Sequence, residues 1–215
     1  MALGYLLKLS VLFRLSNFYP ATFTSMGKNL YIIAGCNGAG KTTASHTILP
    51  YVLDCHEFVN ADEIAKELAP FHPESAAFEA GRIMLTKIDA LMEREESFSF
   101  ETTLSAKSYH LLIKRAKERG FTVTLLFFWL RTIDLAKVRV ATRVLEGGHN
   151  IPPDVIERRY KSGITNLFRI YLPLVDEWLV YDSSEPVIEL IAENNKASFI
   201  RIKNLKKWRQ LNPLN

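Results

Sequence analysis

Residues 29–43 read NLYIIAGCNGAGKTT, and this stretch decides the fold because it contains the pattern G-x-x-x-x-G-K-[ST] at positions 35–42. The apolar run Leu30–Ala34 before the pattern is typical of a short buried parallel strand. A helix is predicted over residues 40–49, where Pro50 is expected to end it. A strand, a glycine-rich loop and a helix in this order are the context that a phosphate-binding loop requires.

Each residue type in the loop has a chemical task. The glycines let backbone N–H groups turn inward around a phosphate, and the helix N-terminus adds the positive end of its dipole. Lys41 supplies a charge to the outer phosphates, and the Thr42 hydroxyl is the expected ligand of a magnesium ion. The alternative is a turn that only packs a helix on a sheet. The residues expected to bind the nucleotide are Gly35, Asn37, Gly38, Ala39, Gly40, Lys41, Thr42 and Thr43.

The rest of the chain alternates between expected strands and helices. Strands are predicted over residues 57–60, 98–101, 122–130, 178–181 and 199–202, with a short apolar segment at 186–191. Helices are predicted over residues 61–68, 74–96, 105–119, 133–145 and 154–171. The inner side of the longest helix is expected to hold Phe78, Ile83, Leu85, Ile88 and Leu91. This alternation predicts an α/β fold: a P-loop NTPase-type parallel sheet with helices on both faces and a helical lid.

The composition is that of an ordinary folded protein. Of the 215 residues, 48% are hydrophobic and 23% are charged, which excludes disordered and collagen-like chains. The net charge of +4 fits an anionic substrate but is too small to indicate nucleic acid, so no nucleic acid is expected. Cys36 and Cys55 have neither metal-ligand spacing nor a disulfide framework, so a reducing, cytoplasmic location is expected.

Three parts are predicted along the chain. Residues 1–25 are an N-terminal extension, too short and too charged to span a bilayer; it is either a misassigned start or an interfacial amphipathic helix. Residues 26–202 form the phosphate-binding domain, in which no transmembrane segment is expected. Residues 203–215 form a basic C-terminal tail, interpreted as a solvated end that carries Lys203, Lys206, Lys207 and Arg209.

Two acidic residues follow expected strands. Asp62 lies just past the strand at 57–60, at the end of the sheet where such folds bind ligands, and is the candidate base for deprotonating an acceptor hydroxyl. From its position alone, Asp62 is equally well explained as a helix N-cap or first-turn acid. Glu101 ends the strand at 98–101. It either binds hydroxyl groups of the acceptor, holds Asp62 in place or is only the polar end of a strand.

Near the turn Gly147-Gly148, the two expected helices that flank it carry Arg139, Arg143, Arg158 and Arg159. Helices with arginines on both sides of a glycine hinge are what a lid that closes over phosphate needs. The alternative is that these arginines are solvated surface residues. Neighbouring helix positions point about 100° apart, so only one of Arg158 and Arg159 can face a cleft. His149 in the turn is either a substrate contact or a cap of the lid.

In combination these segments resemble the zeta toxin family of P-loop kinases, particularly its short branch. The resemblance covers about residues 26–202. The phosphate-binding loop is generic, and the ordered combination of the other segments makes the resemblance specific. The segments that carry it are Gly35–Thr43, Asn60-Ala61-Asp62, Phe100-Glu101-Thr102-Thr103, the region from Arg143 to Tyr160, and Tyr181-Asp182-Ser183.

The resemblance implies an ATP-dependent kinase. In that family ATP phosphorylates a hydroxyl group of UDP-N-acetylglucosamine, and a small helical antitoxin holds some members inactive. By resemblance Lys41 and Thr42 serve ATP and Mg²⁺, with Thr42 as the metal ligand, and Asp62 is the base. The implied substrate-binding residues are Glu101, Thr102 and Thr103. The implied catalytic residues are Lys41, Asp62, Arg143 and one or both of Arg158 and Arg159.

The implied function is transfer of the γ-phosphoryl group to a nucleotide sugar or another small molecule with a hydroxyl group, as the toxin of a toxin–antitoxin pair. One alternative is an ABC-type or motor ATPase. Such an ATPase would need an LSGGQ-like signature segment or a strand ending in an acid, but the strand 122–130 is followed by Arg131. The other alternative is a module that binds a nucleotide without sugar kinase activity; it predicts that ATP binds while Asp62 and Arg143 do not affect turnover.

Overall fold

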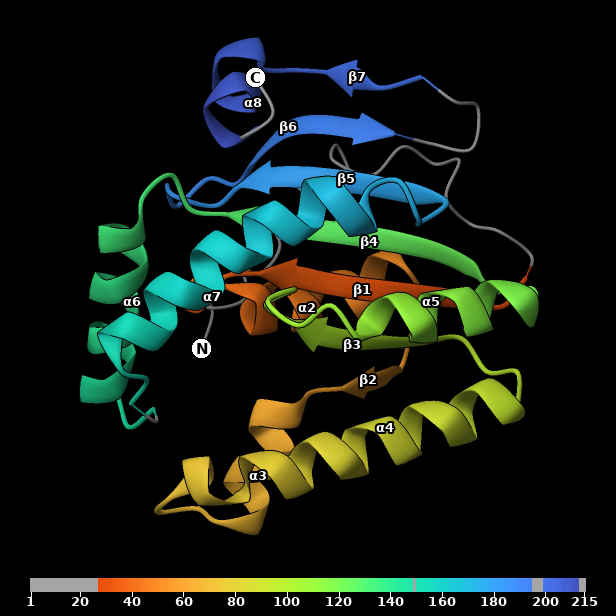
Figure 1. Ribbon diagram of the computed structural model, residues 1–215, viewed down its shortest axis with the longest axis horizontal. Helices are drawn as coiled ribbons and strands as arrows, with labels where there is room; N and C mark the ends of the chain where they lie inside the picture. Colours follow the sequence, from red (N-terminus) through yellow and green to blue (C-terminus); the bar gives the residue numbers. More distant parts are fainter. Residues whose placement is uncertain (1–26, 149, 195–198, 213–215) are drawn as a thin grey trace, which may run out of the picture.

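The computed structural model describes residues 27–148, 150–194 and 199–212, which form a seven-stranded sheet between layers of helices (Figure 1). The strands lie in the order β2-β3-β1-β4-β5-β6-β7. They are β1 (Asn29–Gly35), β2 (Glu57–Val59), β3 (Phe98–Thr102), β4 (Thr122–Trp129), β5 (Glu177–Asp182), β6 (Glu189–Asn194) and β7 (Arg201–Ile202). Strands β1 to β5 pair in parallel, which confirms the predicted α/β class.

The last two strands depart from the predicted parallel sheet. β6 pairs antiparallel with β5, and β7 pairs antiparallel with β6. Only residues 183–188 connect β5 to β6, whereas a crossover between parallel strands needs about a dozen residues. The apolar segment expected at 186–191 is therefore the start of a hairpin strand, and the strand expected at 199–202 shortens to β7.

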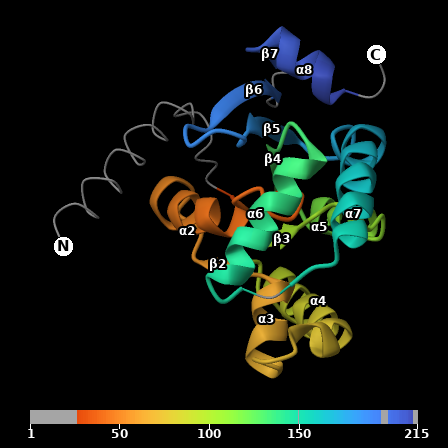
Figure 2. The same ribbon diagram turned by 90° about the vertical axis from the view of Figure 1, so that its left-hand side faces the viewer.

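Helices cover both faces of the sheet, as predicted (Figures 1 and 2). Along β1, Leu30 and Ile32 enter the core beneath α4, α5 and α8, while Tyr31 and Ile33 enter the core beneath α2 and α6. This alternation explains why every residue of β1 is buried. The helices are α2 (Lys41–Val52), α3 (Ala61–Leu68), η1 (Pro73–Ala76), α4 (Ala77–Glu93), α5 (Tyr109–Glu118), α6 (Ile133–Leu145), α7 (Pro153–Asn166), η2 (Leu167–Tyr171) and α8 (Leu205–Leu211).

Several helix predictions need correction. Pro50 does not end α2, which continues to Val52, because proline removes a single hydrogen bond and lies in the last turn. The long helix expected over 74–96 divides into η1 and α4. Its inner side holds Ala80, Met84, Ile88 and Leu91, a strict helical stripe. The prediction was wrong for three bulkier side chains that are exposed instead: Phe78 (89%), Ile83 (36%) and Leu85 (48%).

The C-terminal residues are part of the packed molecule. In α8, Trp208 and Leu211 are buried, and the Trp208 ring stacks on Trp178 of β5 with ring centroids 5.7 Å apart. Lys207 pairs with the buried Asp182 at 2.5 Å. The interpretation of this segment as a solvated end is therefore wrong for α8. The predicted extension, residues 1–25, lies outside the described residues. Within the described ranges, no helix is both long and apolar enough to cross a membrane.

Candidate active site

The glycine-rich loop between β1 and α2 is held close to the sheet. Gly35 has φ of +145°, and a Cβ atom there would lie 2.2 Å from the carbonyl oxygen of Phe128 in β4. Gly40 precedes α2 with φ of +78°, and no side chain of the described residues caps the helix. The first N–H groups of α2 therefore lack side-chain partners and are suited to bind an anion.

Glu101 lies at the centre of a polar cluster at the C-terminal ends of β1 and β3. Its carboxylate is 3.4 Å from the Lys41 ammonium group, and both side chains are almost fully buried. The Thr42 hydroxyl donates to the same carboxylate at 2.8 Å, and the Asn60 amide donates to it at 3.1 Å. Lys41 also donates to the carbonyl of Cys36 at 3.0 Å. Glu101 thus contacts the phosphate-binding loop, and no described hydrogen bond or ion pair joins it to Asp62.

The cluster also fits a magnesium ion. Mg²⁺ prefers oxygen ligands and usually takes one or two from the protein, with the rest from phosphates and water. The Thr42 hydroxyl oxygen and the Glu101 carboxylate supply two oxygen atoms 2.8 Å apart beside the loop. Among the described residues no group of three or more His, Cys, Asp or Glu side chains forms an all-protein metal site. The residues present are therefore suited to a metal that arrives with a nucleotide.

Asp62 does not cap α3. The N-cap is Asn60, whose side-chain oxygen accepts from the backbone N–H of Asp62 at 2.9 Å. The alternative explanation of Asp62 as the N-cap is therefore wrong, although its place in the first turn still favours a carboxylate. The Asp62 side chain is exposed and lines a pocket of about 190 Å³ together with Lys41 and Glu101.

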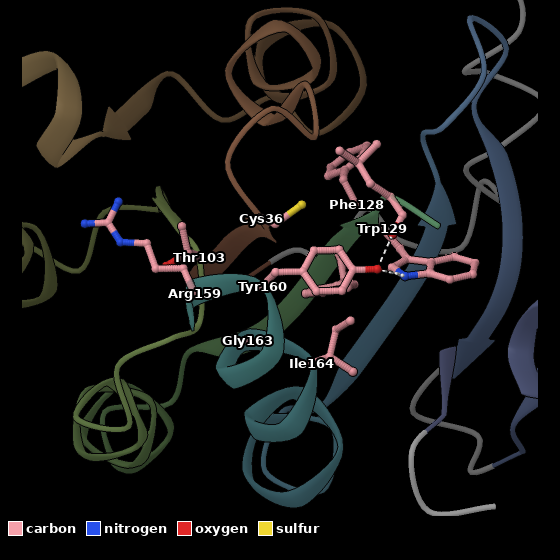
Figure 3. A pocket seen from close by; sticks show the side chains of 10 residues that line it. Cys36, Thr103, Phe128, Trp129, Arg159, Tyr160, Gly163 and Ile164 are labelled. Atoms are coloured by element: carbon pink, nitrogen blue, oxygen red, sulfur yellow. Dashed lines mark hydrogen bonds between the residues drawn. The ribbon is translucent and has the colours of Figure 1, made fainter. Parts of the chain in front are cut away.

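The neighbouring residues Arg158 and Arg159 differ in their relation to this pocket. Arg159 of α7 lines the pocket together with Asp62 of α3, while Arg158 is exposed and does not line it. Figure 3, a view into a different pocket that Arg159 and Thr103 also line, shows Arg159 and its neighbour Tyr160 pointing to opposite sides of the helix. The structure therefore brings Arg159 to Lys41 and Asp62, and it does not bring Arg158 there.

Arg143 lies near the end of α6 in an unusual state. Its Nε and Nη2 atoms are buried and have no hydrogen-bond partner among the described residues. Gly148 covers it closely, since a Cβ atom there would lie 2.8 Å from Arg143 Cγ. One turn earlier, Arg139 donates to the carbonyl groups of Ser183 and Ser184 at 2.8 Å each. Arg139 is thus a structural link, whereas Arg143 has unused donors. The turn residue His149 lies outside the described residues.

The wall of the pocket after β3 consists of hydroxyl groups. Thr102 is buried, and its hydroxyl accepts from the N–H of Leu104 at 3.0 Å. The hydroxyls of Thr103 and Ser105 lie 2.9 Å apart, and both residues line the pocket. Tyr109 lines it from α5; burial raises its pKa, and the charge of Asp62 raises it further. The phenol is thus a neutral hydrogen-bonding group beside the candidate base.

Sequence reasoning assigned no role to Asn60, Ser105 or Tyr109. Asn60 had a detectable signal, because asparagine is a preferred N-cap and here precedes an expected helix. Ser105 and Tyr109 had none, since a loop and a new helix bring them to the pocket. Cys36 within the loop is buried, and burial raises the pKa of its thiol to about 11, which disfavours the reactive thiolate form.

Known proteins resemble this chain in sequence and in fold. The family model described as Zeta toxin matches residues 20–187. A Haemophilus influenzae protein described as uncharacterized is 32% identical over 127 residues, which are 59% of this chain and 88% of that protein. The structure of AvrRxo1-ORF1:AvrRxo1-ORF2 with sulphate ions superposes with a TM-score of 0.73 at 16% identity, covering 97% of this chain and 72% of that one.

A structure from the PezAT chromosomal toxin–antitoxin system of Streptococcus pneumoniae has a TM-score of 0.64 at 15% identity, covering 97% of this chain and 88% of that one. At these identities the solved structures support only the fold. The family model also supports membership of the family, because it spans most of the chain. The resemblance inferred from the ordered motifs is thereby confirmed. The chain belongs to the zeta toxin family and is an ATP-binding phosphotransferase of the P-loop kinase type that acts on a hydroxyl group.

Proposed function

We propose that the chain transfers the γ-phosphoryl group of ATP to a hydroxyl group of a nucleotide sugar such as UDP-N-acetylglucosamine. The observation that carries this proposal is the convergence on one pocket of about 190 Å³ of four charged residues: Lys41, Asp62, Glu101 and Arg159. Phosphoryl transfer needs a cation on the phosphates, a base for the acceptor and a further cation for the transferred group. Each of these needs has a candidate within that pocket.

The proposed division of labour follows from the contacts. Asp62 accepts the proton of the acceptor hydroxyl as the acceptor oxygen bonds to the γ-phosphorus atom and the bond to ADP breaks. Lys41 and Arg159 balance the charge of the phosphate oxygens. Arg143 joins them, because a buried guanidinium with two unused donors is stabilised when an anion supplies the missing acceptors.

Thr42 and Glu101 are the residues that would hold Mg²⁺. When bound, the ion supplies positive charge that neutralises the phosphate oxygens. Lys41 and Thr42 both contact Glu101, so the carboxylate lies beside the two residues that are proposed to serve the phosphates and the metal. The carboxylate also pairs the buried Lys41 ammonium group, which would be costly to bury without a partner.

A second cavity supports an acceptor larger than a monosaccharide. It measures about 540 Å³ and is lined by Lys66, Phe71 and Glu74 on one side and by Gly148 and Asn150 on the other. Lys66 follows Asp62 by one helical turn, so both cavities open along the same face of α3. The second cavity is thus suited to the part of the acceptor that does not react.

The test is incubation with isotope-labelled ATP, magnesium and a panel of nucleotide sugars, with products identified by mass spectrometry. Phosphorylated UDP-N-acetylglucosamine is the expected product, and the folded Lys41→Ala variant is expected to form none because Lys41 serves the phosphates. A product from another nucleotide sugar would correct the acceptor. Binding of ATP with no product from any hydroxyl compound would favour the alternative of a nucleotide-binding module.

We further propose that the kinase acts in the cytoplasm as the toxin of a toxin–antitoxin pair. Support comes from its family and from the solved relative in the PezAT toxin–antitoxin system. The resemblance implies a small helical antitoxin as partner. Induced expression should arrest growth of a bacterial host, and the Lys41→Ala variant should not. Growth arrest by both proteins would contradict a toxicity that depends on phosphoryl transfer.

A further inference from the structure

Helix α7, which carries Arg159, is fastened to the sheet on the side away from the pocket. The Tyr160 hydroxyl donates to the carbonyl of Leu130 at 2.6 Å and accepts from the Trp129 indole N–H at 3.2 Å (Figure 3). The helix continues into η2, whose Leu167 and Tyr171 are buried in the core beneath α5 and α8. Helix α7 is thus attached both to the end of β4 and to the core.

On the pocket side, the same helix touches the loop that follows β3. A Cβ atom at Gly163 would lie 2.5 Å from the carbonyl oxygen of Thr103, so the helix backbone and the loop are in direct contact. The amide of Asn166 donates to the carbonyls of Leu104 and Ser105, at 2.8 and 3.1 Å. The side-chain amide of Asn166 has two N–H donors, and it donates to two neighbouring carbonyls of one loop.

The loop has a conformation that needs such support. Leu104 adopts φ of +57°, which side chains with a Cβ atom rarely adopt, and its side chain is fully buried. The hydrogen bond to the Leu104 carbonyl is buried and the one to the Ser105 carbonyl is partly buried, so leaving these carbonyls unpaired would be costly. Asn166 is only 4% exposed and satisfies both. Asn166 therefore stabilises this turn.

Arg159, Gly163 and Asn166 follow each other at intervals of four and three residues, so they share one face of α7. The first lines the pocket, the second touches the loop and the third holds the loop. One rigid helix face thus sets the distance between the Arg159 guanidinium and the hydroxyl-bearing wall formed by Thr103 and Ser105.

We propose that Asn166 is a positioning residue for the acceptor. It holds residues 103–106 in the strained turn, so that the hydroxyls of Thr103 and Ser105 face the acceptor at a fixed distance from Arg159. This inference rests on the proposed function for the identity of the reaction, and on the contacts of α7 with the loop for the structure of the wall. It assigns no contact between Asn166 and any substrate.

The first measurement needs no acceptor. In Asn166→Ala, amide hydrogen exchange of residues 103–109 should become at least about tenfold faster, because two carbonyls lose their donors. The matched control is Asn204→Ala: the Asn204 amide donates to Glu189 and its oxygen caps α8, far along the chain from the pocket. That variant should accelerate exchange in α8 alone. The proposal would be overturned if the exchange rates of residues 103–109 did not change in Asn166→Ala. It would also be overturned if exchange became faster by the same factor along the whole chain of that variant.

The second measurement separates positioning from stability. With UDP-N-acetylglucosamine as the probe, Asn166→Ala should lower kcat/KM for the acceptor at least about tenfold, while binding of a fluorescent ATP analogue changes less than about twofold. The Asn166→Ser variant keeps one hydrogen-bond donor, so its kcat/KM for the acceptor should lie between those of the wild type and Asn166→Ala. If Asn166→Ala does not fold, Asn166→Ser is used in its place. Equal losses for ATP and acceptor would contradict the proposal. No product from the wild type would refute the proposed acceptor, and the exchange result would still decide the role of Asn166.

Discussion

Replacing Arg159 is expected to slow phosphoryl transfer far more than replacing Arg158. Arg159 lines the pocket with Lys41 and Asp62, whereas its neighbour is exposed and lies outside the pocket. Neither arginine takes part in an ion pair within the described residues. The two substitutions therefore remove the same side chain from the same helix and differ only in the direction in which it points, which makes them matched controls.

The size of the effect follows from what Arg159 faces. An arginine that reaches the transferred phosphoryl group contributes about 10³ to 10⁵ in rate, or about 4 to 7 kcal/mol in the activation free energy. Arg159→Ala should lose about that factor. Arg159→Lys keeps the charge and loses the planar fork, so a loss of at least about 10² is expected. Stability should hardly change: a surface side chain without an ion pair contributes within about 0.5 kcal/mol, or about 1 to 2 °C in Tm.

The assay measures kcat at saturating ATP and acceptor, with ATP affinity measured separately by binding. Arg159 variants should lose kcat with little loss of ATP affinity, which is the pattern of an interaction made mainly in the transition state. Arg158→Ala and Arg158→Lys should retain the wild-type kcat. The reasoning is refuted if the Arg158 variants are as slow as the Arg159 variants, or if the Arg159 variants weaken ATP binding alone.

Two further predictions concern α3 and α8. Asp62→Asn should reduce phosphorylation by at least about 10² while Tm stays nearly constant, because the cap is Asn60 and not Asp62; near-normal activity would exclude Asp62 as the base. Lys207→Met should cost about 3 kcal/mol, the low end for breaking a buried pair, because Arg131 still contacts Asp182. Burial raises the pKa of Asp182, but the hydrogen bonds from Lys207 and Ser184 and the charge of Lys207 together outweigh it, so the pKa is lowered. This stabilisation is therefore present above about pH 4 and lost below it, so the Tm difference should shrink on acidification, measured by thermal unfolding at several pH values.

Local patterns made part of this molecule predictable. The strand, loop and first helix follow from residues 29–43, because glycine positions, apolar runs and helix starts are encoded within a few residues of each other. The helix predicted over 61–68 matches α3, and the helix predicted over 133–145 matches α6. The resemblance came from the order of such local segments, and the family model confirmed it.

Predictions failed where distant contacts decide. The inner side of α4 was assigned to large apolar residues such as Phe78, but the stripe of Ala80 and Met84 is the one that packs inward. At the C-terminus the lysines indicate a solvated end, but the Trp208 ring stacks on Trp178 of β5. Long lysine side chains tolerate this packing because their charged ends reach Asp182 and water at the rim.

The choice between Arg158 and Arg159 shows the same limit within the candidate site. Sequence establishes that only one of two adjacent helix positions faces the cleft, and it does not say which. Two contacts set the rotation of α7 about its axis. At Gly163 the absence of a side chain allows the helix to lie against the Thr103 carbonyl, and Tyr160 donates a hydrogen bond to the carbonyl of Leu130, just after β4. With these two contacts fixed, the helical period turns Arg159 toward the pocket and Arg158 toward solvent. A catalytic assignment in this fold thus depends on a glycine and a tyrosine that need not touch the substrate.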